Sequence, residues 1–447
     1  MFQKVLIANR GEIAVRIIQA CRDLGIISVA VYSEADREAL HAQIADEAVC
    51  IGPARAADSY LNMDNIISAA LASGCQAIHP GFGFLSENPD FAERITQAGL
   101  AFIGPTAATI RLMGDKSEAK RNAIAAGVPV ALGTDGPLRD FDEAISEAER
   151  IGYPVMLKAA SGGGGKGIRV AESVKDLKDA YDSASAEAIA NFGDGRLYME
   201  KYIHNPRHIE VQILGDNYGN VVHLFERECS VQRRHQKLIE ESPSAFVTPE
   251  LREKMTSAAV ALAKRVGYRN AGTIEFLVDN DRNFYFCEMN TRIQVEHPVT
   301  EEVTGVDLVC EQLRVAAGEP LSFKQEDLTI RGHAIECRIN AEDPSRNFAP
   351  CPGTLVSLHL PGGPGVRVDS AAYQGYKIPP FYDSMLGKLI VYGADREQAI
   401  VRMRRALAEM LFEGVVTATD YQMHILCSKA FVEANFNVNS IANGDFD

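Results

Sequence analysis

Short apolar runs alternate with amphipathic stretches through the first part of the chain. The runs KVLIA, ISVAVYS, AVCIG, CQAIHPG and AFIG have the character of buried strands, and GEIAVRIIQACRDLG between the first two has the spacing of an amphipathic helix. Strands that alternate with helices form βαβ units, in which the strands lie parallel. Residues 3–114 therefore predict an α/β domain with a Rossmann-like parallel sheet.

Four consecutive glycines lie between Lys158 and Lys166. They lack the Gly-Lys-Ser/Thr ending of a P-loop, and residues 168–170 have the pattern of a strand rather than the helix that a dinucleotide fingerprint requires. Residues 153–157 are also strand-like. We therefore predict that the glycines form the tip of a hairpin, where backbone N–H groups can approach a nucleotide without Cβ hindrance. Taken alone, the run is equally typical of a plain flexible turn.

A second hairpin is predicted where the alternating runs TIEFLV and FYFCEMN flank the turn NDRN. If the turn centres between residues 281 and 282, Glu275 lies directly opposite Glu288. Like charges that face each other across a ladder destabilise a sheet unless a cation lies between them. Magnesium suits two carboxylates and an amide oxygen such as that of Asn290. A register slip of one residue would separate the charges and leave a solvated edge face instead.

Every second residue stays polar as the chain continues through EMNTRIQVE. On an extended strand, one face would carry Glu288, Asn290, Arg292, Gln294 and Glu296. Metal-binding carboxylates, an arginine for a small anion and a carboxylate for proton transfer together indicate a phosphoryl-transfer site.

Two more segments carry polar residues in a pattern that fits a site. His208, Glu210 and Gln212 share one face of a predicted strand, and VQRRHQK gathers basic charge around His235 and Lys237. Each segment alone also fits a solvated surface.

Composition narrows the class of protein. A length of 447 residues with 46% hydrophobic residues predicts a globular protein of two or three domains. A net charge of −15 argues against nucleic acid as a partner, so an anionic ligand must be met by local lysines and arginines. No apolar run approaches the roughly 18 residues of a membrane span, and the start lacks a signal peptide, which predicts a cytoplasmic protein without a membrane partner. The nine scattered cysteines indicate free thiols.

With these motifs in hand, the chain closely resembles the biotin carboxylase family of the ATP-grasp superfamily. The resemblance covers nearly the whole chain and consists of long strings rather than loose spacings. The strings are KVLIANRGEIAVRII near the start, HPGFGFLSEN at 79–88, KAASGGGGKG at 158–167, ERECSVQRRHQK at 226–237, EMNTRIQVEHPVTE at 288–301 and ECRINAEDP at 336–344.

The resemblance implies a fold that combines α/β and α+β regions. Residues 1–114 would form the N-terminal, pre-ATP-grasp α/β domain. Residues 115–330 would form the ATP-grasp domain, with a mobile glycine-rich lid at about 131–203. Residues 331–447 would form a β-rich C-terminal domain.

The family also implies roles for individual residues and names its cofactors, which are ATP and magnesium or manganese. The nucleotide would be bound by Lys116, Lys158, Gly164, Gly165, Glu200, Lys201, Tyr202, Ile203, His208 and His235. The metal would be bound by Glu275, Glu288 and Asn290. Bicarbonate would be held by Lys237, Arg292, Gln294 and the backbone of Val295. Glu296 would deprotonate bicarbonate, and Arg338 would stabilise the enolate form of biotin.

The implied reaction is ATP-dependent carboxylation of biotin through carboxyphosphate, the first half-reaction of acetyl-CoA carboxylase. The expected partners are a biotin carboxyl carrier protein, carboxyltransferase subunits and a second copy of the chain. Because the sequence lacks a Met-Lys-Met biotin-attachment motif, we expect a free-standing subunit. Phe82 stands where many members carry tyrosine, which puts one hydrogen bond near biotin in doubt.

Three alternatives remain open at this point. A carboxylase for another acyl-CoA or a 2-oxo acid would contain the same component. Another ATP-grasp ligase, such as a carbamoyl-phosphate-type enzyme, would share the fold and the metal carboxylates. A non-catalytic nucleotide-binding regulator would bind ATP without turnover, and intact Glu296 and Arg292 argue against it.

Overall fold

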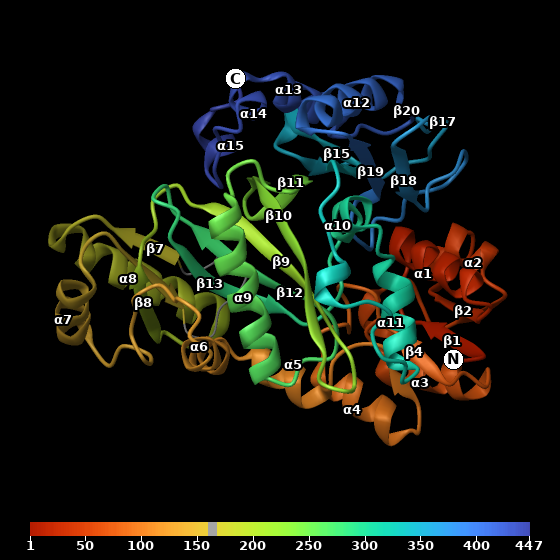
Figure 1. Cartoon of the computed structure of the whole chain (residues 1–447), viewed down its shortest axis with the longest axis horizontal. Helices are drawn as coiled ribbons and strands as arrows, with labels where there is room; N and C mark the ends of the chain where they lie inside the picture. Colours follow the sequence, from red (N-terminus) through yellow and green to blue (C-terminus); the bar gives the residue numbers. More distant parts are fainter. Residues whose placement is uncertain (160–167) are drawn as a thin grey trace.

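The protein is described here by a computed structural model, which covers residues 1–159 and 168–447. Figure 1 shows three regions: a small parallel sheet near the N-terminus, a large central sheet, and a small three-stranded unit at the far side. Within the described residues, no helix is both long enough and apolar enough to span a membrane.

The N-terminal region is the predicted α/β domain. Its five strands lie parallel in the order β3-β2-β1-β4-β5, so the prediction of a Rossmann-like sheet is confirmed. The strands are β1 (Lys4–Ile7), β2 (Ile27–Tyr32), β3 (Glu47–Cys50), β4 (Ala77–His79) and β5 (Ala101–Phe102). The helices are α1 (Gly11–Asp23), α2 (Leu40–Ile44), α3 (Met63–Ala72), α4 (Pro89–Gln97) and α5 (Ala107–Gly114), with short 3-10 turns at Glu34–Asp36 and Ala56–Asp58.

Helix α1 connects this domain to the central sheet. Its apolar residues recur at helical spacing and are buried, among them Ile13, Ile17 and Cys21. The helix packs on β2 within its own domain and also on β18 and β19 of the central sheet. The N-terminal domain is therefore held against the sheet that carries the candidate site.

The three-stranded unit contains the strands on both sides of the glycine run. Its sheet has the order β7-β6-β8, and β6 pairs antiparallel with β7. The flanks of the predicted hairpin are thus confirmed, while Gly164 and Gly165 lie outside the described residues. The elements are α6 (Lys116–Ala125), which leads into the unit, α7 (Phe141–Ile151), β6 (Val155–Ala159), β7 (Ile168–Ala171), α8 (Val174–Phe192) and β8 (Leu197–Lys201).

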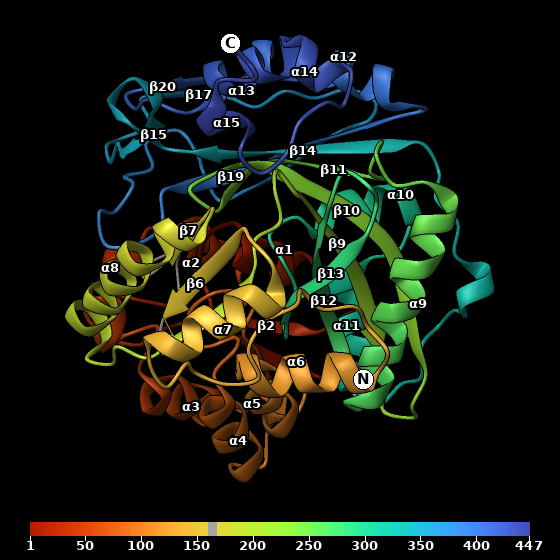
Figure 2. The same cartoon turned by 90° about the vertical axis from the view of Figure 1, so that its left-hand side faces the viewer.

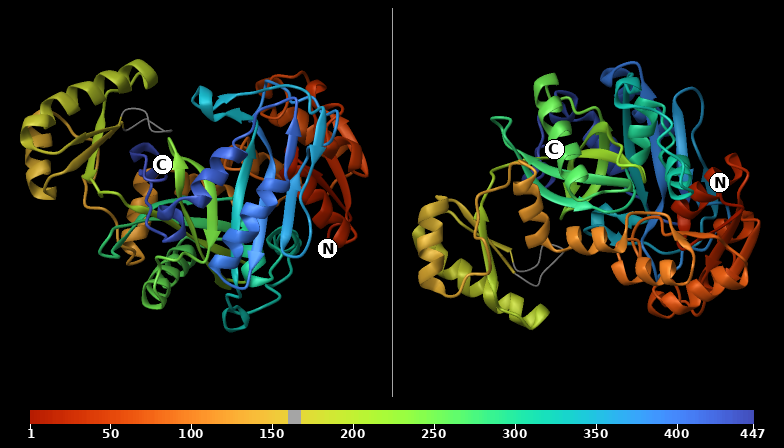
Figure 3. Two further views of the ribbon diagram at one scale, coloured as in Figure 1. Left: turned by 90° about the horizontal axis from the view of Figure 1, so that it is seen from above. Right: turned by 60° about the horizontal axis from the view of Figure 1, so that its bottom comes forward.

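The unit has a hydrophobic core of its own. The apolar residues of this core all lie between Leu138 and Met199. Both views of Figure 3 show the unit standing to one side of the remaining molecule. An element with its own core can change its position without unfolding, as a lid requires.

The central sheet has eight strands in the order β13-β12-β9-β10-β11-β14-β19-β18, and each strand is antiparallel to its neighbours. Its strands are β9 (Arg207–Gly215), β10 (Val221–Arg233), β11 (Gln236–Ser242), β12 (Asn270–Val278), β13 (Phe284–Asn290), β14 (His333–Asn340), β18 (Val366–Ser370) and β19 (Met385–Gly393). Because β11 pairs with β14, one sheet continues across the predicted boundary at residue 330.

Helices cover both faces of this sheet. Helix α9 packs on β9 and β10, whereas α10 and α12 lie on opposite faces of β14. Figure 2 shows the C-terminal helices as the outermost layer. The helices are α9 (Pro249–Arg265), α10 (His297–Thr304), α11 (Leu308–Ala316), α12 (Arg396–Glu409), α13 (Thr419–Cys427), α14 (Lys429–Val432) and α15 (Ser440–Asn443). Minor elements are β15 (Glu342–Asp343), β16 (Ala349–Pro350), β17 (Ser357–His359), β20 (Leu411–Glu413) and 3-10 turns at Gln325–Asp327 and Pro344–Arg346.

The predicted carboxylate hairpin is present as β12 and β13. Glu275 lies directly opposite Glu288, as predicted. The pairing near the turn differs by one residue from the predicted register, because Phe276 lies opposite Phe286. A bulge between Glu275 and Phe276 then shifts the register and brings the two carboxylates face to face.

The prediction that the alternating strand extends to residue 296 is wrong. Strand β13 ends at Asn290, and residues 291–296 form bends and turns before α10 begins. The N–H group of Thr291 donates to the carboxylate of Glu87 at 3.0 Å rather than to a neighbouring strand. A side chain from the N-terminal domain thus ends the strand.

Two fully buried carboxylates, Glu240 and Glu336, face each other across β11 and β14. Burial and the nearby Glu296 carboxylate raise the pKa of Glu240 to about 7, although the Arg338 guanidinium opposes this shift. Burial and Glu240 raise the pKa of Glu336 well above its ordinary value, against the opposing charge of Lys388. The pair therefore favours a protonated state, and deprotonation of Glu240 weakens the fold.

This pair predicts a pH-dependent stability. The folded-state pKa of Glu240 is raised, so its contribution to stability is fully present below the unfolded-state pKa of about 4.5. That contribution is lost as the pH rises through the folded-state pKa of about 7. Glutamine does not ionise, so Glu240→Gln should avoid this loss. Between pH 5 and pH 8, its free energy of unfolding should rise by about 1–3 kcal/mol relative to that of the wild type. Urea unfolding across that range measures the difference.

Glu241→Gln is the matched control, because Glu241 is also buried, is next in the strand and has a pKa held to about 2 by Arg396 and His333 against the effect of burial. The difference in free energy of unfolding between Glu241→Gln and the wild type should stay constant from pH 5 to 8. A constant difference for Glu240→Gln would contradict the prediction.

Candidate active site

One largely buried ammonium group lies at the centre of the site. The Nζ atom of Lys237 in β11 is 2.6 Å from Glu210 Oε2, 3.1 Å from Glu275 Oε1, 3.2 Å from Gln294 Oε1 and 2.5 Å from Glu296 Oε1. These partners come from β9, β12 and the segment at 291–296. The structure therefore brings together residues that the sequence placed in four separate motifs.

The charges in this cluster stabilise one another. Burial alone would lower the pKa of Lys237, yet the Glu210, Glu275 and Glu296 carboxylates raise it well above its ordinary value. Burial would likewise raise the pKa of Glu275 and Glu296, and Lys237 instead lowers both. The three carboxylates are consequently anionic around a fixed cation.

Arg227 supports the cluster from within the sheet. Its side chain is fully buried, and its Nε atom donates to Glu210 Oε1 at 2.5 Å. Its Nη1 atom donates to Gln212 Oε1 at 2.7 Å. The prediction that His208, Glu210 and Gln212 share a strand face is confirmed in β9, and the solvated-surface alternative is wrong for Glu210 and Gln212, which are fully buried.

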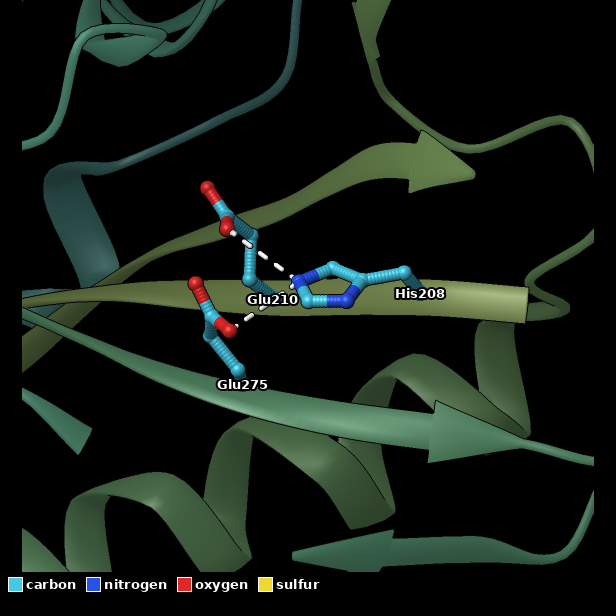
Figure 4. Close-up of side chains that lie close together, drawn as sticks. All are labelled: His208, Glu210 and Glu275. Carbon is cyan, nitrogen blue, oxygen red and sulfur yellow. Dashed lines mark ion pairs between the residues drawn. The ribbon is translucent and has the colours of Figure 1, made fainter. Parts of the chain in front are cut away.

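Figure 4 shows the imidazole of His208 pointing toward the carboxylates of Glu210 and Glu275. Its Nε2 atom lies 3.2 Å from Glu275 Oε2 and 3.8 Å from Glu210 Oε2. Burial would lower the pKa of His208, but Glu275 raises it to about 9. A cationic imidazole thus lies beside the carboxylate that is predicted to bind metal.

The predicted metal ligands supply oxygen atoms suited to magnesium. Glu275 and Glu288 are a cross-strand pair, which leaves two carboxylates facing each other. Desolvation by the surrounding protein and the Glu275 charge raise the pKa of Glu288, although its side chain is partly open to solvent. Asn290 is buried, and its Oδ1 atom accepts a hydrogen bond from Arg292 at 2.9 Å. Two carboxylates and one amide oxygen match the preference of magnesium or manganese for hard ligands.

Arg292 is held by a residue of the N-terminal domain. Its Nε atom lies 2.8 Å from Glu87 Oε2. Sequence reasoning missed Glu87, although it lies within the quoted string HPGFGFLSEN. Nothing in the spacing could indicate this contact, because 205 positions separate the two residues.

Arg338 lies between two carboxylates. Its Nη2 atom is 2.8 Å from Glu296 Oε2, and its Nε atom is 2.6 Å from Glu240 Oε1. Ile335, Cys337 and Ile339, which alternate with Arg338 along β14, face the core under α12. Sequence analysis did not identify Glu240 as a partner of Arg338.

The residues predicted to bind the nucleotide line the connection to the three-stranded unit. Lys158 Nζ lies 2.5 Å from Glu200 Oε2, and Lys120, which was not predicted, lies 3.3 Å from Glu200 Oε1. Lys116 begins α6 and is close enough to Glu288 to oppose the rise in its pKa.

The remaining predicted nucleotide residues have different surroundings. Lys201 donates to the carbonyl oxygens of Gly152 and Tyr153, so its side chain supports the unit's own backbone. Tyr202, just before Ile203, packs edge to face on His204. His235 is exposed in the turn between β10 and β11.

Comparisons with known protein families cover almost the whole chain. Residues 1–110 match the family described as biotin carboxylase, N-terminal domain. Residues 115–324 match the ATP binding domain of the carbamoyl-phosphate synthase L chain, and residues 336–443 match the biotin carboxylase C-terminal domain.

Individual proteins agree with these matches. Biotin carboxylase 1 of Bacillus subtilis is 56% identical over 446 residues, which cover 100% of this chain and 99% of the relative. The biotin carboxylase of Campylobacter jejuni, solved as a beta-gamma-ATP complex, is 49% identical with a TM-score of 0.94 and covers 99% of both chains.

A third similar protein was solved with nucleotide and bicarbonate bound. The biotin carboxylase domain dimer of 2-oxoglutarate carboxylase from Hydrogenobacter thermophilus was solved with MgADP, ADP and bicarbonate. It is 51% identical with a TM-score of 0.94, over 100% of this chain and 99% of that one. Identity at this level over the full length, with three matching domains in order, makes this chain a member of the biotin carboxylase family.

Proposed function

We propose that this chain uses ATP and bicarbonate to carboxylate biotin carried on a separate protein. Full-length identity to biotin carboxylases carries this proposal. The cluster around Lys237 supports it chemically, because one fixed cation surrounded by carboxylates and an amide can receive a small anion next to a base.

The nucleotide would lie between the central sheet and the three-stranded unit. Lys116, Lys158, His208 and Glu200 lie along this boundary, and lysines are suited to phosphate oxygens. Glu275, Glu288 and Asn290 would hold magnesium, which when bound neutralises phosphate charge. Closure of the unit over the site would exclude water, which a carboxyphosphate intermediate requires.

Bicarbonate would be held by Lys237, Arg292, Gln294 and the backbone N–H of Val295. Glu296 would accept its proton, so that the oxygen can attack the γ-phosphate of ATP. In this structure Glu296 is bound by both Lys237 and Arg338, at 2.5 and 2.8 Å. Substrates that take over these two cations would leave the carboxylate free to act as a base.

Arg338 would then stabilise negative charge on the ureido oxygen of biotin. Its fixed fork of N–H donors suits a localised oxyanion better than a lysine would. Phosphate released from carboxyphosphate would take the proton from the ureido nitrogen, which then attacks carbon dioxide.

The partners follow from the reaction. We propose a homodimer, a biotin carboxyl carrier protein and carboxyltransferase subunits, with acetyl-CoA as the first candidate acceptor. A 2-oxo acid is the second candidate, because a 2-oxoglutarate carboxylase domain is similar over the full length. We also propose 1–114, 115–330 and 331–447 as the three domains, with a lid at about 131–203.

A direct assay tests the proposed function. Purified protein with magnesium, ATP, labelled bicarbonate and free biotin should form labelled carboxybiotin, and ADP release should depend on bicarbonate and rise with biotin. ADP release that ignored bicarbonate would overturn the proposal, and a requirement for ammonia would favour a carbamoyl-phosphate-type ligase.

The metal assignment predicts a change in magnesium dependence. Glu288→Gln removes one of two facing carboxylates. The magnesium concentration for half-maximal ATP hydrolysis should rise several-fold, or turnover should be lost. Asp281→Asn in the turn of the same hairpin is the control and should leave this concentration unchanged. Unchanged magnesium dependence in Glu288→Gln would remove Glu288 from the metal site.

The base assignment predicts a loss of bicarbonate-dependent turnover. Glu296→Ala should lower it by about 10²-fold or more, as expected for a lost general base. Glu226→Ala is the control, because Glu226 is a buried carboxylate paired with Arg252 outside the site. A near-normal rate in Glu296→Ala, measured by ADP release, would exclude Glu296 from this role.

The biotin assignment predicts uncoupling of the two half-reactions. Arg338→Gln should keep most of the bicarbonate-dependent ATP cleavage, because Lys237 still holds Glu296 at 2.5 Å. It should lose carboxybiotin formation, because charge on the ureido oxygen develops only after carboxyphosphate forms. Phosphate release and labelled-carboxyl transfer are measured in parallel. Arg396→Gln is the control, since Arg396 also pairs with a buried glutamate, Glu241, but outside the site. Equal loss of both activities with lower thermal stability would instead assign Arg338 a structural role.

A further inference from the structure

The segment at 291–296 carries Arg292, Gln294 and Glu296 but belongs to no strand or helix. Its backbone therefore lacks the regular hydrogen bonds of a sheet or helix. The side chains of Gln294 and Glu296 nevertheless reach Lys237 at 3.2 and 2.5 Å. A backbone hydrogen bond from the N–H of His297 to the carbonyl oxygen of Gln294 is long, at 3.4 Å, so other contacts must fix the backbone between these two residues.

Two fully buried side chains bind successive carbonyl groups of this segment. His297 Nδ1 lies 2.8 Å from the carbonyl oxygen of Gln294. Lys388 Nζ donates to the carbonyl oxygen of Val295 at 2.8 Å. The two peptide units on either side of the Val295 Cα atom are thus each held by a side chain.

The hydrogen bond from His297 fixes its protonation state. A carbonyl oxygen can only accept, so Nδ1 must carry a proton. Burial and the cations of Lys388, Arg16 and Arg367 hold the pKa of His297 well below its ordinary value. The imidazole is therefore neutral with its proton on Nδ1.

Lys388 is firmly anchored in the sheet. It lies in β19 directly opposite Arg338 of β14. Its Nζ atom is 3.3 Å from Glu12 in α1 and 4.0 Å from Asp369 in β18. Against the effect of burial, Arg367 and Lys388 hold the pKa of Asp369 below its ordinary value, so Asp369 is the ionised partner. Burial raises the pKa of Glu12 to about 7, although Lys388 opposes this shift. The two partners together position the Lys388 ammonium group under the Val295 carbonyl.

Because the peptide bond is trans, these contacts also fix the direction of the Val295 N–H group. The carbonyl of Gln294 and the N–H of Val295 belong to one plane and point in opposite directions. Holding the Gln294 carbonyl against His297 therefore aims the Val295 N–H the other way. Within residues 1–159 and 168–447 no hydrogen bond from this N–H group is found, so it is available to an anion.

We propose that His297 and Lys388 are positioning residues for the bicarbonate step, which fix the two peptide planes around Val295 and aim its N–H group at the anion. This inference rests on the proposed function. Neither residue touches the substrate, and both act through the backbone of the segment at 291–296.

The test uses variants that remove or keep the hydrogen-bond donor at position 297 or 388. His297→Leu removes the donor at similar volume, whereas His297→Asn keeps an amide N–H near the position of Nδ1. Lys388→Met removes the ammonium, and the double variant Lys388→Met with Glu12→Gln also replaces the carboxyl group that Lys388 contacts. The KM values for bicarbonate and for ATP are measured from bicarbonate-dependent ADP release by the full chain.

We expect His297→Leu and both Lys388 variants to raise the KM for bicarbonate by roughly tenfold, while the KM for ATP changes less than about twofold. His297→Asn should stay within about threefold of the wild type. A merely structural role would lower thermal stability without separating the two KM values and without rescue by asparagine. His41→Leu, which removes another fully buried histidine far from the segment, should leave the KM for bicarbonate unchanged.

Should His297→Leu fail to fold, His297→Gln replaces it, because its amide nitrogen reaches the position of Nε2 rather than Nδ1. An unchanged KM for bicarbonate in the folded variants would overturn the inference while the proposed function stands. Wild-type ADP release that ignores bicarbonate would instead overturn the proposed function, and the inference with it.

Discussion

The contact of Lys237 with three buried carboxylates is the interaction on which the site depends. Burial of several like charges is costly unless opposite charge lies within hydrogen-bonding distance. Lys237 supplies that charge to Glu210, Glu275 and Glu296 at once, from three separate parts of the chain. Loss of its ammonium would leave an uncompensated negative cluster in the centre of the sheet.

The same arrangement explains how a stable cluster can be reactive. Glu296 is bound on one oxygen by Lys237 and on the other by Arg338, so it is fully ionised and fixed in place. Donors that are positioned before the reaction stabilise developing charge without reorganising. Substrates that replace protein partners one at a time would keep the charge balanced throughout the cycle.

Local patterns in the sequence predicted the parallel sheet, both hairpins and the pairing of Glu275 with Glu288. The extension of the strand beyond Asn290 was wrong, because the partner that ends it, Glu87, comes from another domain. The contacts from Arg338 to Glu240 and from Lys388 to Val295 also join residues 98 and 93 positions apart. Alternation along one strand carries no information about such partners, which tertiary packing alone selects.

These long-range contacts show why the site needs all three parts of the chain. Glu87 and Glu12 of the N-terminal domain reach Arg292 and Lys388, respectively, so that domain acts on the segment at 291–296 from two sides. The C-terminal strand β19 supplies Lys388, and the central strands supply the carboxylates. A segment without regular structure gains a defined backbone only where these parts meet. The precision of the site is therefore a property of domain packing, and a loosened contact between α1 and β19 would disturb the backbone at Val295 before it disturbed any catalytic side chain.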